Sequence, residues 1–184
     1  MQNSDFLLCV AQVGVTFAGF AGVIGVFRPS EAKWIPQEVA GLRFILGHTL
    51  GSVLFALLPF PLLALTNDET KVWHISTELL AAFLIVVTVW QFYEVVRLTK
   101  KRHAPRRPII LYCILAVGLC AAVFTAVGAF RIPQFAFETG LLWLLVAAGI
   151  QFWIFVSHFA TATETGHDVT RVMPNSNVGR QPDD

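Results

Sequence analysis

Five apolar stretches dominate this sequence, at residues 6–27, 42–66, 75–98, 108–131 and 140–163. Roughly 20 helical residues, each rising about 1.5 Å, cross the ~30 Å hydrocarbon core of a bilayer, so every stretch is long enough to span it. Within lipid, a helix satisfies its own backbone hydrogen bonds, whereas an open sheet edge leaves polar groups without partners. We therefore predict an all-α fold, an integral membrane bundle of five transmembrane helices.

Composition leaves little room for a soluble domain. The chain is 55% hydrophobic and only 14% charged, against about 25% charged in ordinary soluble domains. We expect one membrane domain over residues 1–163 and a disordered polar tail over residues 164–184. A formal net charge of +1 argues against a nucleic-acid partner, because such binding needs an excess of basic side chains. The first partner of this chain is the lipid bilayer.

The basic residues predict an orientation. If the N-terminus lies outside, all of the 13 Lys and Arg residues except Lys71 and Arg131 fall on the cytoplasmic side. Loops rich in Lys and Arg stay in the cytoplasm. The sequence therefore predicts an N-out, C-in, multi-pass protein of the cell membrane. The residues on the cytoplasmic side are Arg28, Lys33, Arg43, Arg97, Lys100, Lys101, Arg102, Arg106, Arg107, Arg171 and Arg180.

Small residues recur at helical spacing within the apolar stretches. Because lipid gives no hydrophobic drive for helices to associate, close backbone approach through small side chains becomes a main source of attraction. We predict that these faces pack against protein, which can be the same chain, a second copy or another membrane subunit. The residues are Ala11, Gly14, Ala18, Gly22 and Gly25 in the first stretch, Gly47 and Gly51 in the second, and Gly118 and Ala122 in the fourth.

The string VTFAGFAGVIGVFR at residues 15–28, followed by a basic segment and by Leu-Leu-Pro at residues 57–59, resembles the opening of small uncharacterised bacterial inner-membrane proteins. The resemblance covers about the first third of the chain, and its motif is a packing motif. It implies a bacterial inner-membrane location. It brings no activity and no catalytic residue with it.

Polar residues within the stretches need a reason, because polar groups in hydrocarbon are costly. With the predicted orientation, His48, Gln91, Glu94 and His158 come to a similar depth, roughly 6–10 Å inside the cytoplasmic boundary, and Gln151 lies seven residues from His158 on the same helix face. A Glu beside a His can relay protons near neutral pH. Polar residues near helix ends also serve as interfacial anchors and as hydrogen bonds between helices. Both interpretations apply to this predicted polar layer of His48, Gln91, Glu94, Gln151 and His158.

Enzyme and metal motifs are missing from the sequence, which contains no HExxH, GxSxG or Walker A pattern. We therefore predict no catalytic residues, no metal site and no required cofactor. The one cofactor arrangement to consider is a b-type haem held by His48 and His158 as axial ligands. Single histidines on helices more often make structural hydrogen bonds.

Three functions follow, in order of preference. The leading one is a small multi-pass membrane protein that acts through helix association, as a scaffold, sensor or accessory subunit. The alternative is a channel or transporter whose pathway passes His48, Glu94 and His158. A haem-bearing membrane redox protein comes third.

Overall fold

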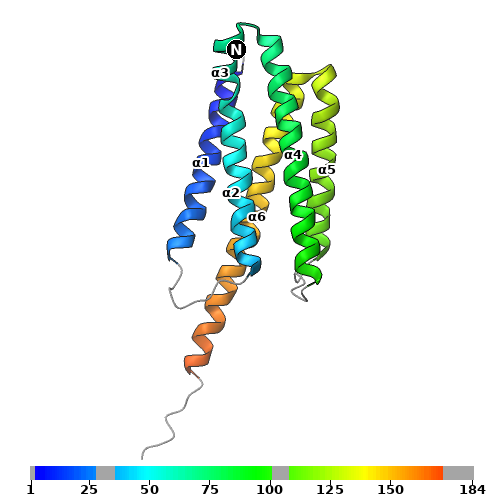
Figure 1. Cartoon of the computed structure of the whole chain (residues 1–184). Coiled ribbons are helices and arrows are strands. Elements are labelled where there is room, and N and C mark those ends of the chain that lie inside the picture. The colour runs from blue at the N-terminus through cyan, green and yellow to red at the C-terminus, as the bar shows by residue number, and fades with distance from the viewer. Residues whose placement is uncertain (1–2, 28–35, 101–107, 172–184) are drawn as a thin grey trace, which may run out of the picture.

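The structure, a computed structural model, describes residues 3–27, 36–100 and 108–171, and every regular element within them is an α-helix. The helices run alternately in opposite directions and lie side by side, with the short α3 continuing from the end of α2 (Figure 1). The predicted all-α fold is confirmed. The helices are α1 (Ser4–Phe27), α2 (Pro36–Leu57), α3 (Pro59–Thr66), α4 (Glu69–Lys100), α5 (Pro108–Arg131) and α6 (Pro133–Arg171).

Four stretches of the described helices are long and apolar enough to cross a membrane, namely Ser4–Val26, Val39–Thr66, Glu69–Arg97 and Pro133–Ser157. They match four of the five predicted spans. The remaining predicted span, 108–131, coincides with α5, whose described apolar part is the shorter Leu115–Arg131. A crossing by α5 therefore stays a prediction, as does the orientation. Of the residues on which the orientation rests, Arg28, Lys33, Lys101, Arg102, Arg106, Arg107 and Arg180 lie outside the described residues.

Two prolines break the helix between α2 and α3. Pro59 and Pro61 have no backbone N–H to donate, so the helical hydrogen bonds to the carbonyl oxygens of Phe55 and Leu57 are missing. The chain still bonds from Leu62 N–H to Leu58 O at 3.4 Å. The segment ends at Asn67, whose left-handed backbone (φ 51°) lets its N–H bond the carbonyl of Leu63.

Two helices are longer than their apolar stretches. Helix α4 begins at Glu69, not at 75, because the Asp68 carboxylate accepts the backbone N–H of Thr70 and of Lys71 and so caps its first turn. Helix α6 begins at Pro133, not at 140, since Pro is well suited to the first helical position. It also continues through residues 164–171 of the predicted tail, and residues 172–184 lie outside the described residues.

Helix α6 is the central helix and packs against α1, α2, α4 and α5. The buried core along it divides into two apolar clusters. The larger cluster includes Leu7, Phe55, Leu80, Phe137 and Leu141, and the smaller one includes Ala21, Ile45 and Phe155. The larger lies toward the end of the bundle that holds the chain's N-terminus (Figure 1).

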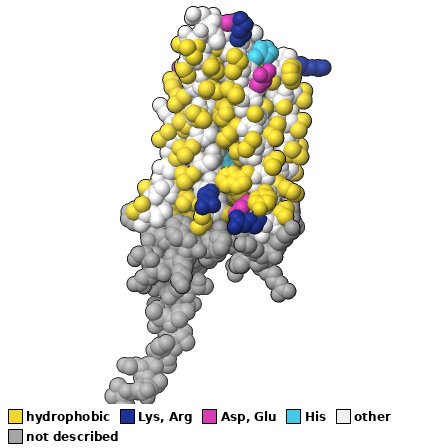
Figure 2. All heavy atoms as spheres, viewed as in Figure 1, with side chains coloured by type: hydrophobic (Ala, Val, Ile, Leu, Met, Phe, Trp, Pro, Cys, Tyr) yellow, Lys and Arg dark blue, Asp and Glu magenta, His cyan; other side chains and the backbone are white. Residues whose placement is uncertain are grey.

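The outside of the bundle is apolar. Hydrophobic side chains cover its middle in Figure 2, while the visible Lys, Arg, Asp and Glu side chains gather at its two ends. Large exposed side chains on several helices include Val26, Leu54, Val86, Val127 and Trp153. An apolar exterior with charges restricted to the ends is the surface expected of a protein embedded in a bilayer.

Candidate functional site

The polar side chains buried inside the bundle are the first candidates for function. Half of the eight described ones are hydroxyls that bond back to their own helix, as Thr49 does to Ile45 O at 2.8 Å and Thr125 to Ala121 O at 2.8 Å. Such bonds satisfy the hydroxyl without involving another helix. The longer buried polar side chains are His48, Gln91 and Gln151.

His48 and Gln91 join α2 to α4 through a direct side-chain hydrogen bond. The Nε2 atoms of the two residues lie 2.9 Å apart, and the exposed fractions of the side chains are only 4% and 8%. The other ring nitrogen, His48 Nδ1, lies 2.7 Å from the carbonyl oxygen of Phe44, one turn earlier on α2. The Phe44 ring meets the Trp90 ring edge to face at 6.1 Å, so aromatic side chains flank the pair.

These two contacts, with the Gln91 amide as it lies in the structure, favour one tautomer of the neutral imidazole. A carbonyl oxygen only accepts hydrogen bonds, so Nδ1 carries the ring proton and donates it to Phe44 O. Nε2 is then the acceptor, and the Gln91 amide N–H₂ donates to it. The arrangement holds a neutral ring. A protonated ring would place an Nε2–H donor against the amide donor, unless the Gln91 amide turned to present its oxygen.

Glu94 is not part of this pair. The Oε2 atom of Glu94 lies 3.6 Å from Arg97 Nη1, one turn further along α4, and the Arg97 side chain is 54% exposed. This is the geometry of a residue that reaches for the membrane surface. His158 lies within α6, but its side chain falls outside the described residues.

The register between α2 and α6 separates the two histidines. A Cβ atom on Gly41 would lie 3.6 Å from Cδ2 of Phe155, so these positions are level. Because the helices are antiparallel, Gln151 lies within about one turn of His48, whereas residue 158 lies about ten residues, or ~15 Å, further along the axis. The buried Gln151 side chain makes no hydrogen bond to any described residue.

Two of the predicted packing residues, Gly14 and Gly51, lie in tight helix contacts. A Cβ atom on Gly14 would come within 2.7 Å of Val53 Cγ2 and 2.8 Å of Ser52 Oγ, so α1 approaches α2 closely at this glycine. On α2, a Cβ atom on Gly51 would lie 2.7 Å from the Phe83 ring of α4. Two other packing residues, Ala11 and Ala122, are buried.

The remaining predicted packing residues are more open. Gly118 has only ordinary contacts, at 3.7 Å, with Thr88 and Trp143. A Cβ atom at Gly22, Gly25 or Gly47 would meet no described atom within 4 Å. Ala18 is half-buried, so its exposure is intermediate between that of Gly14 and that of Gly22. The small-residue stripe of α1 is therefore packed within the chain near Gly14 and uncovered near Gly22.

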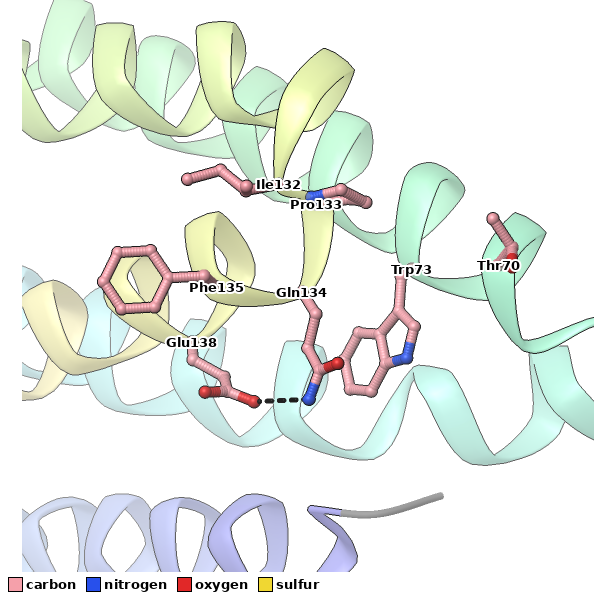
Figure 3. Close-up of a pocket in the computed structure, with 7 residues that line it drawn as sticks. All are labelled: Thr70, Trp73, Ile132, Pro133, Gln134, Phe135 and Glu138. Atoms are coloured by element: carbon pink, nitrogen blue, oxygen red, sulfur yellow. Dashed lines mark hydrogen bonds between the residues drawn. The ribbon is translucent and has the colours of Figure 1, made fainter.

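A second candidate site lies at the end of the bundle that holds the N-terminus. An open cavity of about 480 Å³ lies between the start of α4 and the turn from α5 to α6. The Glu138 carboxylate on its wall accepts hydrogen bonds from Asn3 Nδ2 at 2.5 Å and from Gln134 Nε2 at 3.1 Å (Figure 3). The residues around the cavity are Thr70, Trp73, Ile132, Pro133, Gln134, Phe135 and Glu138.

This cavity could not be anticipated from the sequence. Asn3 and Glu138 are 135 residues apart, so no local pattern links them. The only sequence feature that pointed to this region was Glu138, which lies just before the apolar stretch 140–163.

Comparison of the chain with protein-family models, with curated proteins and with solved structures finds no match. Function is therefore inferred from the sites themselves. Among the described residues, no three His, Cys, Asp or Glu side chains come together as a metal site requires.

Proposed function

We propose that this chain is a five-span protein of a bacterial inner membrane, N-out and C-in, that acts through helix association as a scaffold, sensor or accessory subunit. The observation that carries the proposal is the uncovered glycine face of α1. Gly19 and Gly22 are exposed, and no described atom would contact a Cβ atom at either position.

The shape of this face suits a neighbouring helix. Val15 and Val26 are exposed at 59% and 81%, and they flank the two glycines at steps of four, three and four residues along one side of α1. A shallow groove between β-branched side chains lets a second helix approach closely, and van der Waals attraction at such short range is a main source of helix association in lipid. Glycine turned toward lipid brings no comparable attraction.

The position of α1 supports the same conclusion. Helix α1 packs on α2 and α6 and touches little else, so it lies at the edge of the bundle (Figure 1). Its packed side, at Leu7, Val10 and Gly14, holds it in place. The opposite side is free to receive a partner, which is a second copy of this chain or another membrane subunit.

Gly22→Leu tests the proposal. The substitution fills the glycine face without touching a described atom of the same chain, so the monomer should fold normally. The complex should become smaller, as measured by native gel mobility after mild detergent extraction from the membrane of origin. Val127→Leu is the matched control, because it adds a methylene group to an exposed site on α5. A wild-type chain that runs as a monomer, or a Gly22→Leu complex of unchanged size, would contradict the proposal.

The His48–Gln91 pair favours a second candidate function, a channel or transporter. A buried titratable group in the bundle interior is the usual mark of a proton or cation route. In proteoliposomes, proton flux driven by a pH gradient should then disappear in His48→Phe and persist in His74→Gln, which changes a half-buried histidine near the start of α4. Wild-type flux no greater than that of empty liposomes would rule this candidate out.

A further inference from the structure

The cavity at the N-terminal end of the bundle holds a carboxylate with spare capacity. Both hydrogen bonds that Glu138 accepts, from Asn3 and from Gln134, go to the same oxygen, Oε1. The other oxygen, Oε2, accepts no hydrogen bond from a described residue. An ionised carboxylate has about four lone-pair sites, so much of its accepting capacity remains open.

No basic side chain in the described part of the chain compensates the negative charge of Glu138. Within the described part of the chain, no Lys, Arg or His comes within 4 Å of this carboxylate. Lys71, the basic residue at the start of α4, is paired with Asp68 at 3.2 Å. Asn3 and Gln134 donate only neutral N–H groups. A half-buried carboxylate beside a bilayer, held in place by two donors and lacking a counter-charge, is arranged to receive a cation.

The walls of the cavity narrow the class of cation. Trp73, Ile132, Pro133 and Phe135 make them largely apolar and partly aromatic; Phe135 is 59% exposed, whereas Trp73 is only 5% exposed. Figure 3 shows the Glu138 carboxylate and the Gln134 amide pointing toward each other, with the Trp73 ring next to the amide. Small metal cations prefer several oxygen ligands and carry tightly bound water, so they suit these walls poorly. Organic ammonium groups suit them well, because aromatic rings and one carboxylate contact both the alkyl part and the charge.

We propose that this cavity binds the ammonium group of a small organic cation, with Glu138 as the counter-charge and the aromatic wall around its alkyl substituents. Two sources supply that chemistry at the end of a membrane bundle. One is a free amine or quaternary ammonium compound in the aqueous phase. The other is the headgroup of an amine-bearing lipid such as phosphatidylethanolamine.

Thermal unfolding of the full chain distinguishes the two sources. In detergent, choline chloride or ethanolamine hydrochloride should raise the Tm in a saturable way, whereas NaCl at equal ionic strength should not, because a ligand of the folded state stabilises it by mass action. If the source is lipid, free amines have little effect and nanodiscs of phosphatidylethanolamine give a higher Tm than nanodiscs of phosphatidylglycerol. No stabilisation in either arm, or an equal rise with NaCl, would overturn the proposal.

Two substitutions assign the effect to the cavity. Glu138→Gln keeps the acceptor for Asn3 and removes the charge, so the amine concentration at half-effect should rise at least about tenfold, or the lipid preference should vanish. Glu78→Gln, at an exposed carboxylate on α4 outside the cavity, is the control and should leave the response unchanged. Gln134→Lys supplies an ammonium group one turn from Glu138. Gln134→Lys should raise the Tm in the absence of ligand and abolish the rise in Tm caused by the amine or the lipid. This variant tests the site even if Glu138→Gln does not fold. An unchanged response in both variants would contradict the assignment.

Discussion

The His48 imidazole has both ring nitrogens engaged inside the bundle, at Phe44 O and at the Gln91 amide. Satisfying both nitrogens removes the cost of burying a polar ring in an apolar environment, and the bond to Gln91 also ties α2 to α4. Glu94, three residues from Gln91, is paired with Arg97 instead. The pair is therefore a structural hydrogen bond first, and a proton relay only if the amide turns.

Gln91→Leu should destabilise the protein by about 1 kcal/mol, because it leaves His48 Nε2 buried without a donor. The free energy of unfolding in detergent measures the effect, and Gln12→Leu, at an exposed position on α1, is the matched control. The double variant with His48→Phe should lose less stability than the two single changes added together. Strictly additive losses would show that the two side chains do not interact.

At the level of whole helices, α1 presents two different faces although both carry small residues. Near Gly14 the helix touches α2 closely, and near Gly22 it faces outward. The spacing of small residues along the sequence is regular across both regions. Only the rotation of α1 about its axis, set by side chains such as Leu7 and Val10 that pack into the core, decides which glycines are covered.

Gly14→Leu and Gly22→Leu should therefore differ. The first forces a side chain into Val53 and the Thr49 backbone, and we expect a loss of about 1–3 kcal/mol in the free energy of unfolding. The second should change the stability of the isolated chain little, because it points into open space. Unfolding curves of the two variants in the same detergent make the comparison. Similar losses in both would mean that the two faces are not distinct.

The Asp68 cap at the start of α4 should make stability depend on pH. The backbone N–H of Lys71, followed by its side chain, lowers the pKa of the Asp68 carboxyl below its ordinary value of 3.8. Because this pKa is lowered on folding, the ionised carboxylate stabilises the protein above the ordinary value. The contribution is lost as the pH falls through the lowered pKa.

Asp68→Asn tests this dependence, because it keeps a side-chain acceptor for the cap but has no charge. Its Tm should lie below that of the wild type near neutral pH, and the difference should shrink as the pH falls below 3.8. Asp68→Ala should lower the Tm further near neutral pH, since it also removes the cap. A difference between the wild type and Asp68→Asn that grows in acid would contradict the assignment.

For the whole molecule, the sequence predicts where the helices lie along the chain far better than it predicts the contacts between them. Apolar stretches located the helices because crossing lipid demands a long run of apolar residues. They missed the first turns of α4 and α6, since the Asp68 cap and Pro133 extend these helices through polar sequence. A hydropathy pattern carries no information about an N-cap.

In the candidate sites too, the sequence predicts positions along the helices but not the contacts between helices. Sequence placed His48 and Gln91 at a similar depth, but helix rotation decides that they bond to each other. The local ion pair between Glu94 and Arg97 follows from their i, i+3 spacing and was open to prediction. The contact of Asn3 with Glu138 was not, because it depends on how α1 packs beside α6.

Every proposed function of this chain assumes five spans and a cytoplasmic C-terminus, and one measurement tests on which side of the membrane the C-terminus lies. Two reporter proteins would be fused separately after Asp184. Alkaline phosphatase is active only in the periplasm, and green fluorescent protein is fluorescent in the cytoplasm. An N-out chain with five spans predicts a fluorescent fusion and an inactive phosphatase. An active phosphatase with a dark fluorescent partner would contradict this topology.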